Sequence, residues 1–343
     1  MKDLLIFLAV FLFAYFGVGL FRSWSLRREL FDIPNERSSH DKPVPRGGGL
    51  VIVAVCLLFY SLGAVLFENP FSWSYFVGAI LIAIVSWLDD LFSIPLIWRF
   101  LVHCAAAIIL VGGTDFGHLI NVPIFGYYVG WGGISIITFL WIVWMVNAYN
   151  FMDGIDGIAG LQGVLAGSGW LLFGLFHGYE GISFYGGVLI FGCLGFLFHN
   201  WHPAKVFMGD VGSAFLGFTF AAFPLLATGE RVGNFEPLLI AAFSFVWFFL
   251  FDTALTLVLR LSRRKKVWMP HREHLYQRLI ILGKSHDSVT VLYGLLAAVI
   301  VAVAVAYTVF RGIFGVLLFF IMVVLSLLLV FLSFRKKRID LSN

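Results

Sequence analysis

The chain alternates between apolar runs of about twenty residues and short segments that carry nearly all of its charge. An α-helix of this length spans the hydrocarbon core of a bilayer. A transmembrane β-strand would alternate with a period of two residues, which these runs do not. The pattern therefore predicts an all-α, polytopic integral membrane protein. We expect about eleven transmembrane helices, at about 4–22, 48–67, 72–88, 96–112, 132–149, 157–176, 182–198, 211–228, 237–260, 289–309 and 313–334.

The basic residues lie almost entirely in one of the two sets of loops between these runs. Of the 23 Lys and Arg residues, 20 belong to one set and only Lys2, Arg231 and Arg311 to the other. Positively charged loops stay in the cytoplasm. The charge pattern therefore predicts an N-terminus outside and a cytoplasmic C-terminus, which agrees with an odd number of spans. The basic set comprises 22–47, 89–99, 150–156, 199–210, 260–288 and the tail from Arg335.

The composition excludes several classes of protein. Hydrophobic residues make up 61% of the chain, which is too many for a soluble domain. The cysteines lie inside apolar runs and suggest neither a disulfide framework nor a metal site, and no P-loop or dinucleotide-binding fingerprint is present. The run from Leu4 to Phe21 lacks a small-x-small cleavage site, so we expect an uncleaved first helix. No linker or repeat divides the chain, which favours a single domain over residues 1–343.

The most informative polar segment is 147–160, NAYNFMDGIDGIAG, which lies between two apolar runs. It contains two amides, Asn147 and Asn150, and two carboxylates, Asp153 and Asp156. Carboxylates beside a hydrocarbon core are costly unless they bind something, and oxygen ligands of this kind suit Mg²⁺. The two aspartates lie three apart and would share one face of a helix. The alternative is a polar turn that caps two helices.

Two more acidic motifs end on the same predicted side of the membrane. Asp89 and Asp90 are adjacent at a span end, where they repel and favour a cation or a shared proton. Either could hold Mg²⁺ or act as a base, or the pair could simply end the helix. In NWHPAKVFMGDVGS (200–213), Asp210 opens the next span as a metal ligand or as a helix-capping anion. Phe207 offers a face on which a base could stack.

Two basic segments share that side. PHREHLYQRL (270–279) places His271, Arg272 and His274 together as donors that match phosphate oxygens. Its histidine spacing also permits zinc. RSSHDKPVPRGGG (37–49) combines His40, Lys42 and Arg46 with three glycines, and could cradle a phosphate or serve only as topology-setting charge. These sequence-distant clusters reach one face and predict one composite site at the cytoplasmic surface.

Three further features carry no firm chemistry. Asp252 lies inside a predicted span, where a buried acid is functional by default unless Thr253, Thr256 or a neighbouring helix satisfies it. His103 is expected to be a hydrogen-bonded structural residue. The outer segment His118–Gly130 alternates loosely and could form a small hairpin.

These motifs, in this order, resemble those of the polyprenyl-phosphate N-acetylhexosamine-1-phosphate transferases, glycosyltransferase family 4. The resemblance covers nearly the whole chain and rests on RSSHDKPVPRGGG, Asp89-Asp90, NAYNFMDGIDG, HNWHPAKVFMGDVGS and HREHLYQRL. It implies that undecaprenyl phosphate attacks the β-phosphorus of a UDP-N-acetyl sugar, which yields undecaprenyl-diphosphate-sugar and UMP. This would be the first membrane step of O-antigen or other cell-surface polysaccharide synthesis.

The resemblance also implies a cofactor, a location and a set of residues. The cofactor would be Mg²⁺, for which Mn²⁺ could substitute, in a homodimer of the bacterial inner (cytoplasmic) membrane; nucleic acid is not an expected partner. The metal ligands would be Asp210 and Asp153. The catalytic residues would be Asp89, Asp90, Asp153 and His271. The substrate-binding residues would be His40, Lys42, Arg46, Asn147, Asn150, Asp156, Asn200, Lys205, Phe207, Arg272 and His274.

Departures from the family pattern narrow the range of possible substrates. The last basic loop reads His271-Arg272-Glu273-His274 instead of three consecutive histidines, and no lysine closely follows Asp90. Both departures argue against the peptidoglycan lipid-intermediate translocase and favour the O-antigen-initiating branch. The residues do not distinguish GlcNAc, FucNAc and QuiNAc.

Two other classes remain as alternatives. A secondary transporter would place its charges near the bilayer midplane and would usually show repeats. An intramembrane aspartyl protease could use Asp210 and Asp252, but would leave the basic loop unexplained.

Overall fold

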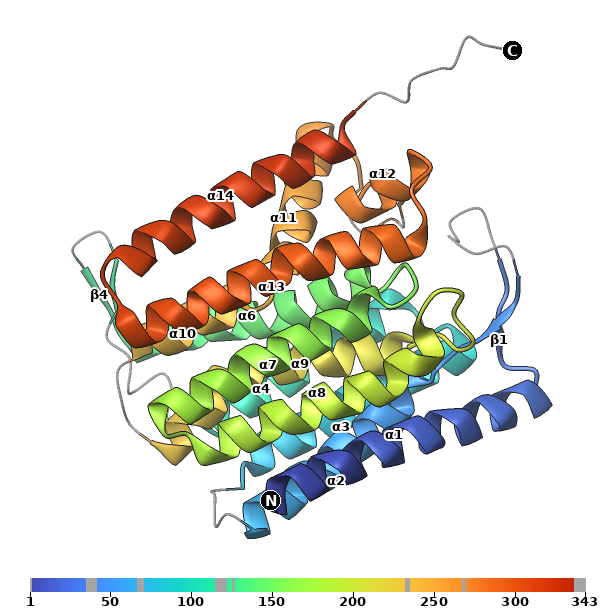
Figure 1. Ribbon diagram of the computed structural model, residues 1–343, viewed down its shortest axis with the longest axis horizontal. Helices are drawn as coiled ribbons and strands as arrows, with labels where there is room; N and C mark the ends of the chain where they lie inside the picture. The colour runs from blue at the N-terminus through green and yellow to red at the C-terminus, as the bar shows by residue number, and fades with distance from the viewer. Residues whose placement is uncertain are drawn as a thin grey trace.

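The computed structural model describes residues 2–34, 42–66, 71–114, 122–124, 127–231, 235–266, 269 and 271–335. This part of the chain is a helical bundle, as predicted (Figure 1). The helices are α1 (Lys2–Arg27), α2 (Gly49–Leu66), α3 (Trp73–Phe92), α4 (Leu96–Gly112), α6 (Trp131–Met152), α7 (Ile158–His177), α8 (Glu180–Asn200), α9 (Asp210–Glu230), α10 (Phe235–Ser244), α11 (Trp247–Ser262), α12 (Leu275–Ile281), α13 (His286–Phe310) and α14 (Ile313–Ser333).

Two short hairpins mark the two ends of the bundle. The strands β1 (Phe31–Asp32) and β2 (Val44–Pro45) pair in antiparallel fashion, and lie with α12 at the right of Figure 1. The strands β3 (Val122–Ile124) and β4 (Tyr127–Val129) pair at the opposite end. The second pair confirms the hairpin expected between His118 and Gly130.

Nine of the described helices are long and apolar enough to cross a membrane, or ten if one bent pair counts as a span. They confirm a multi-pass membrane protein, although two of the predicted spans differ. α4 has 17 residues, which at about 1.5 Å per residue is about 25 Å and therefore short for a bilayer core.

The prediction of one continuous helix over 237–260 was wrong. The chain forms α10 and α11, which meet at an angle of 68°. The side-chain amide of Gln162, on α7, donates a hydrogen bond of 2.6 Å to the carbonyl oxygen of Phe245. The N–H of Phe249, which would bond that carbonyl in a regular helix, bonds Val246 instead. A polar side chain from a neighbouring helix thus replaces one helical hydrogen bond at the bend.

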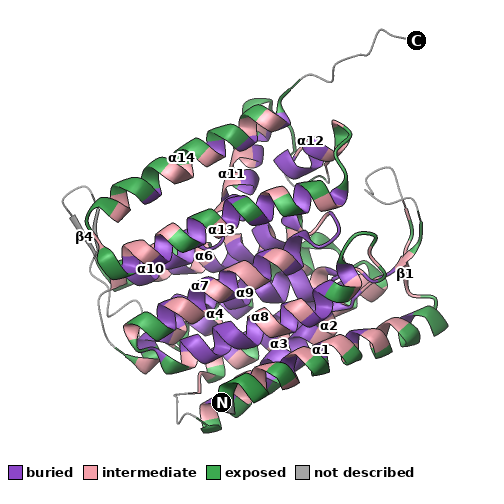
Figure 2. Cartoon of the chain, viewed as in Figure 1, coloured by how far each residue is buried: buried purple, intermediate pink, exposed green. Residues whose placement is uncertain are grey.

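α9 is the centre of the bundle, and α1 and α14 lie at its surface. In the most apolar stretch of α9, 94% of the residues are buried, against 17% in α14 (Figure 2). α9 packs against α2, α3, α6 and α10. Many of its residues are Gly, Ala, Ser or Thr, whose small side chains let neighbouring helices approach closely in a membrane. The central position of α9 carries its first residue, Asp210, to the meeting point of several other helix ends.

Candidate active site

Four carboxylates from three separate regions of the sequence meet at the end of the bundle that carries β1–β2 and α12. Asp89 and Asp90 lie in the last turn of α3, Asp153 directly follows α6, and Asp210 begins α9. Burial, together with the negative charge of Asp210, raises the pKa of Asp153 to about 8. These acids therefore influence one another electrostatically, as the predicted composite site requires.

Two arginines tie the carboxylates together. Arg46 bonds Asp90 at 2.8 Å and Asp210 at 2.7 Å. Arg99 bonds Asp210 at 2.5 Å and also pairs with Asp89. Although burial opposes the charged form of Arg46, the two acids outweigh it and raise the pKa of the guanidinium above its ordinary value.

Arg99 was missed in the sequence, where it counted only as a topology-setting charge. A signal was present, because Arg99 is the fourth residue of a helix that is otherwise almost wholly apolar. Charged side chains in such helices usually face the protein interior and pair with one another.

Backbone hydrogen bonds join the glycine-rich segment to the segment that precedes α9. The N–H of Phe207 bonds the carbonyl of Pro45 at 2.8 Å, and the N–H of Gly48 bonds the carbonyl of Phe207 at 2.9 Å. The two chains also approach closely at Gly49, where a Cβ atom would lie 2.4 Å from the Cα of Gly212. The glycines thus allow the contact that places Arg46 beside the start of α9.

The adjacent acids of α3 are not equivalent. Asp90 accepts hydrogen bonds from the backbone N–H groups of Asp210, at 3.0 Å, and Val211, at 3.1 Å, and its side chain is only 2% exposed. A carboxylate is favourable at a helix N-terminus. Gly209, with φ of +76°, leaves room for it, since a Cβ there would lie 2.5 Å from Asp90 Oδ2. Asp90 therefore anchors α9, and Asp89 faces Arg99.

The two asparagines of the 147–160 segment also differ. Asn150 donates to Asp210 at 3.3 Å and accepts a hydrogen bond from Ser213 at 2.6 Å. Asn147 donates to the carbonyl of Val143 in its own helix. The structure therefore links Asn150 to the acidic cluster, while no hydrogen bond among the described residues does so for Asn147.

The acidic cluster has the donor set that a hard divalent cation prefers. Its four carboxylates and two arginines carry a formal charge of −2 when all are ionised. Within the described part of the chain, no hydrogen-bond donor reaches the carboxylate of Asp153, which lies among other acids. A cation would satisfy such a group, and oxygen ligands suit Mg²⁺. Asp153 and Asp210, predicted as metal ligands, therefore fit this ion.

Asp156 does not join the acidic cluster. It accepts hydrogen bonds from His202 at 2.6 Å and from the N–H of Ala204 at 3.1 Å, and His286 lies 3.4 Å away. Burial acts to raise its pKa, but the hydrogen bonds from His286 and His202 outweigh burial and lower it. Residues 153–157 are not helical, so the helical face that Asp153 and Asp156 would share does not form.

Asn200, predicted to bind substrate, instead joins two loops. Its side-chain oxygen accepts a hydrogen bond from the N–H of Gly157 at 3.0 Å, and its amide donates to Val206 at 2.9 Å. Only 3% of the residue is exposed. Because both ends of the amide are used within the protein, we assign Asn200 to positioning the loops that follow α6 and α8.

The basic loop before α12 is held by Asp252, which is fully buried. Asp252 accepts hydrogen bonds from five donors, which satisfies an acid whose role the sequence left open. The donors are His274 Nδ1 at 3.1 Å, the N–H groups of Leu275 at 2.9 Å and Tyr276 at 3.2 Å, Tyr293 at 2.7 Å and Thr256 at 3.2 Å.

The histidines of this loop occupy different environments. His274 is buried against Asp252, whereas His271 is half-buried with its ring centre 4.9 Å from that of His274. Burial, together with the neighbouring His274 and Arg260, lowers the pKa of His271 to about 4. His271 is therefore neutral at neutral pH and can offer hydrogen bonds but no positive charge.

The remaining predicted residues have varied positions. Arg272 and Phe207 are half-buried, Lys42 and Lys205 are exposed, and His40 lies outside the described residues. The hydrogen-bonded role expected for His103 was wrong. Both of its ring nitrogens are buried without a hydrogen-bond partner in the described part of the structure.

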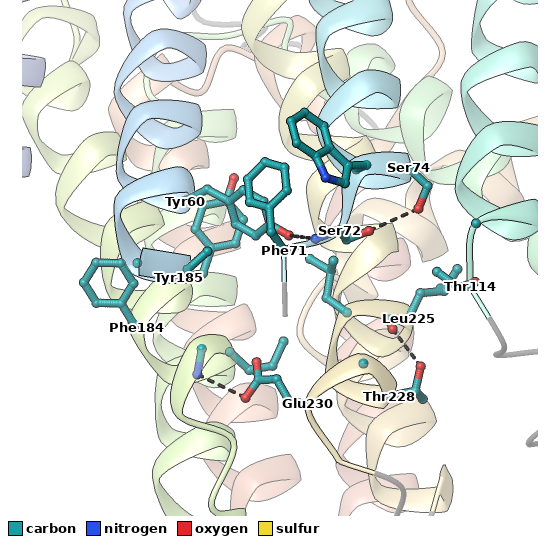
Figure 3. A pocket seen from close by; sticks show the side chains of 18 residues that line it. Tyr60, Phe71, Ser72, Ser74, Thr114, Phe184, Tyr185, Leu225, Thr228 and Glu230 are labelled. Atoms are coloured by element: carbon teal, nitrogen blue, oxygen red, sulfur yellow. Dashed lines mark hydrogen bonds between the residues drawn. The ribbon is translucent and has the colours of Figure 1, made fainter. Parts of the chain in front are cut away.

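A cavity of about 590 Å³ lies near the end of α9, at the opposite end of the bundle from Asp210. Figure 3 shows the side chains that line it. Its wall includes Tyr60, Phe71, Ser72, Tyr185 and Glu230, and Glu230 accepts a hydrogen bond from the N–H of Gly181. None of the residues predicted for the site lines this cavity. The acidic cluster is therefore identified as the candidate site by its chemistry and not by the size of a cavity.

Comparison with known proteins identifies the family of the chain. The family model described as glycosyl transferase family 4 matches residues 72–228. A probable undecaprenyl-phosphate N-acetylglucosaminyl 1-phosphate transferase of Bacillus subtilis is 31% identical over 268 residues, which cover 76% of this chain and 73% of the relative. The chain therefore belongs to glycosyl transferase family 4.

Two other relatives extend over more of the chain. A decaprenyl-phosphate N-acetylglucosaminephosphotransferase of Mycobacterium leprae is 31% identical to this chain. The match covers 89% of this chain and 83% of the relative. An undecaprenyl-phosphate alpha-N-acetylglucosaminyl 1-phosphate transferase of Salmonella typhi is 28% identical. That match covers 87% of this chain and 82% of the relative.

Family membership confirms the resemblance drawn from the motifs. The protein is a membrane-embedded transferase, which disfavours the transporter and protease alternatives. All four acids of the cluster lie inside the matched range, whereas Arg46 and the loop before α12 lie outside it.

Proposed function

We propose that the chain transfers an N-acetylhexosamine 1-phosphate from a UDP-sugar to undecaprenyl phosphate and releases UMP. N-acetylglucosamine is the first donor sugar to test, because the relatives named above carry it in their names. The reaction would take place on the cytoplasmic side of the bacterial inner membrane and begin a cell-surface polysaccharide. The observation that carries the proposal is the cluster of Asp89, Asp153 and Asp210 with Arg46 and Arg99 at one end of the membrane bundle.

This cluster suits the transfer of a phosphoryl group between two anions. Mg²⁺, when held by Asp153 and Asp210, would supply positive charge that reduces the repulsion between the lipid phosphate and the sugar diphosphate. Arg46 and Arg99 present planar donors that match phosphate oxygens. Both pair with Asp210, and there they would stabilise the negative charge that is redistributed as the phosphoryl group moves.

A strong general base is not required by this arrangement. The lipid phosphate is already ionised at neutral pH and can attack without losing a proton. Asp89 is paired with Arg99, and Asp90 accepts two backbone N–H groups as well as Arg46. These contacts engage both carboxylates within the protein. We therefore propose that these acids position the arginines and α9.

The direct test is UMP release by protein purified in detergent. The assay would contain undecaprenyl phosphate, Mg²⁺ and each of a panel of UDP-N-acetyl sugars. Release with one donor, abolished by EDTA and restored by Mg²⁺, is expected and would identify the sugar. Folded protein that releases no UMP with any of the donors would contradict the proposal.

Arg99 provides a prediction that the family motifs alone would not suggest. Arg99→Gln is expected to lower kcat/KM for UMP release by about 10²-fold, because it removes a charge-assisted donor beside the transferring phosphate. Arg99→Lys keeps the positive charge but not the planar donor geometry, so its kcat/KM should lie between those of the wild type and Arg99→Gln. Arg311→Gln, at the opposite end of the bundle, is the control. A rate for Arg99→Gln within twofold of the wild type would exclude this role.

Asp153 predicts how Mg²⁺ binding depends on pH. Its pKa of about 8 means that the carboxyl holds a proton at neutral pH when no metal is bound. Mg²⁺ must displace that proton, so the half-saturating Mg²⁺ concentration should fall as pH rises toward 8 and level off above it. The half-saturating Mg²⁺ concentration would be measured by competition with Mn²⁺, whose binding is monitored by electron paramagnetic resonance. The same pH dependence in Asp153→Asn would show that another group titrates.

A further inference from the structure

A second group of potential metal ligands lies outside the acidic cluster. Asp156, His202 and His286 come from the loop after α6, the segment after α8 and the first turn of α13. One ligand atom from each lies within 4.8 Å of the others. The three side chains thus connect three elements at the end of the bundle.

The distance between His286 and Asp156 matches that between two ligands of one metal ion. His286 Nδ1 lies 3.5 Å from the backbone nitrogen of Asp156, and its tautomer decides whether it accepts a hydrogen bond from that N–H or donates one to the Asp156 carboxylate. The same nitrogen lies 3.4 Å from Asp156 Oδ1, which also carries lone pairs. In the tautomer that leaves Nδ1 unprotonated, a cation between the two atoms would relieve the repulsion between their lone pairs. Ligand atoms of a tetrahedral zinc ion, each about 2.0–2.1 Å from the metal, lie about 3.3–3.4 Å apart.

The third ligand can reach the same position. His202 Nδ1 lies 2.6 Å from Asp156 Oδ2, where its proton makes a hydrogen bond that a metal ion would replace. Its ring centre is 5.2 Å from that of His286. The side chain of His202 is 40% exposed, so it has room to adjust to the spacing that coordination needs. The N–H of Ala204 donates to the same carboxylate oxygen, as outer partners of metal ligands commonly do.

We propose that Asp156, His202 and His286 form a binding site for a Zn²⁺-class divalent cation, separate from the Mg²⁺ site. Two imidazoles and one carboxylate favour zinc over magnesium, which prefers oxygen ligands alone. Because three protein ligands leave one position of a tetrahedral zinc ion open, water would fill it. The ion would fasten the loop that carries Asp153 to the segment before α9 and to α13.

The test measures metal content and does not depend on catalysis. The full chain would be purified in detergent with a tag that contains no histidine, stripped with EDTA and equilibrated with Zn²⁺ in excess Mg²⁺. One zinc per chain is expected by mass spectrometry. His202→Asn and His286→Asn should each bind zinc at least about tenfold more weakly. His177→Asn, at the far end of α7, is the matched control and should bind as the wild type does.

Cobalt gives a second readout of the same site. Co²⁺ in place of Zn²⁺ should give the intense visible bands of a four-coordinate ion, and these bands should be lost in His202→Asn. This exposed position tolerates substitution, so the test holds even if His286→Asn does not fold.

Two results would overturn the proposal. One is wild-type protein that takes up no more zinc than the double variant His202→Asn/His286→Asn; the three side chains would then form only a hydrogen-bonded brace. The other is equal zinc binding by the wild type and both single variants. A chain that binds zinc at this site but releases no UMP would contradict the proposed reaction and leave this inference intact.

Discussion

Asp210→Asn is expected to lower the rate of UMP release by about 10²–10³-fold, the largest effect on activity that we predict. Asp210 is the acid on which the cluster converges, since it accepts hydrogen bonds from Arg46, Arg99 and Asn150. An amide is nearly the same size but carries no charge, so it would bind Mg²⁺ weakly. It would also leave the two arginines without their shared counter-ion.

The measurement is UMP release over a range of Mg²⁺ concentrations. Weaker metal binding predicts that high Mg²⁺ restores part of the lost rate. Asp3→Asn, an exposed aspartate in the first turn of α1, is the control. Size-exclusion chromatography would confirm that both variants fold. A rate for Asp210→Asn close to that of Asp3→Asn would remove Asp210 from the metal site.

Asp252→Ala is expected to have the largest effect on stability. Removing one partner of a buried ion pair costs about 3–5 kcal/mol, because the other is left without compensation. Here the substitution would leave His274 and the first N–H groups of α12 without their acceptor. We expect α12 to open before the bundle unfolds, because this carboxylate holds the first residues of α12 against α11 and α13.

Tyr293→Phe is the matched control for this prediction. It removes one of the five hydrogen bonds to Asp252 and keeps the ring, so it should cost only about 1 kcal/mol. Hydrogen exchange of residues 275–281, together with thermal unfolding in detergent, would measure both effects. If exchange in α12 were equally fast in Asp252→Ala and Tyr293→Phe, the carboxylate would not be the residue that holds this helix.

Much of the fold could be predicted from the sequence because its main constraint is local. In a membrane a segment must satisfy its own backbone hydrogen bonds, so the length of an apolar run nearly determines a helix. The ends of α3, α6 and α9 accordingly lie close to the predicted positions. The bend at Phe245 could not be predicted in this way, since its cause is Gln162, 83 residues away.

The candidate site, too, could be predicted only in part from the sequence. The motifs identified the acids and the family, because those residues stand in short, ordered patterns. They did not indicate Arg99, which has no motif of its own, or distinguish Asp89 from Asp90.

The sequence by itself determined that this is an all-α membrane protein with polar motifs at the ends of its apolar runs, and to which family it belongs. Only the tertiary structure decided which of those polar groups meet. Arg46 reaches Asp210 across 164 residues, and Asp156 turns toward His202 and His286 and away from Asp210. The reason is physical: hydrogen bonds and ion pairs depend on distances of a few ångströms, which helix packing sets and local sequence patterns do not.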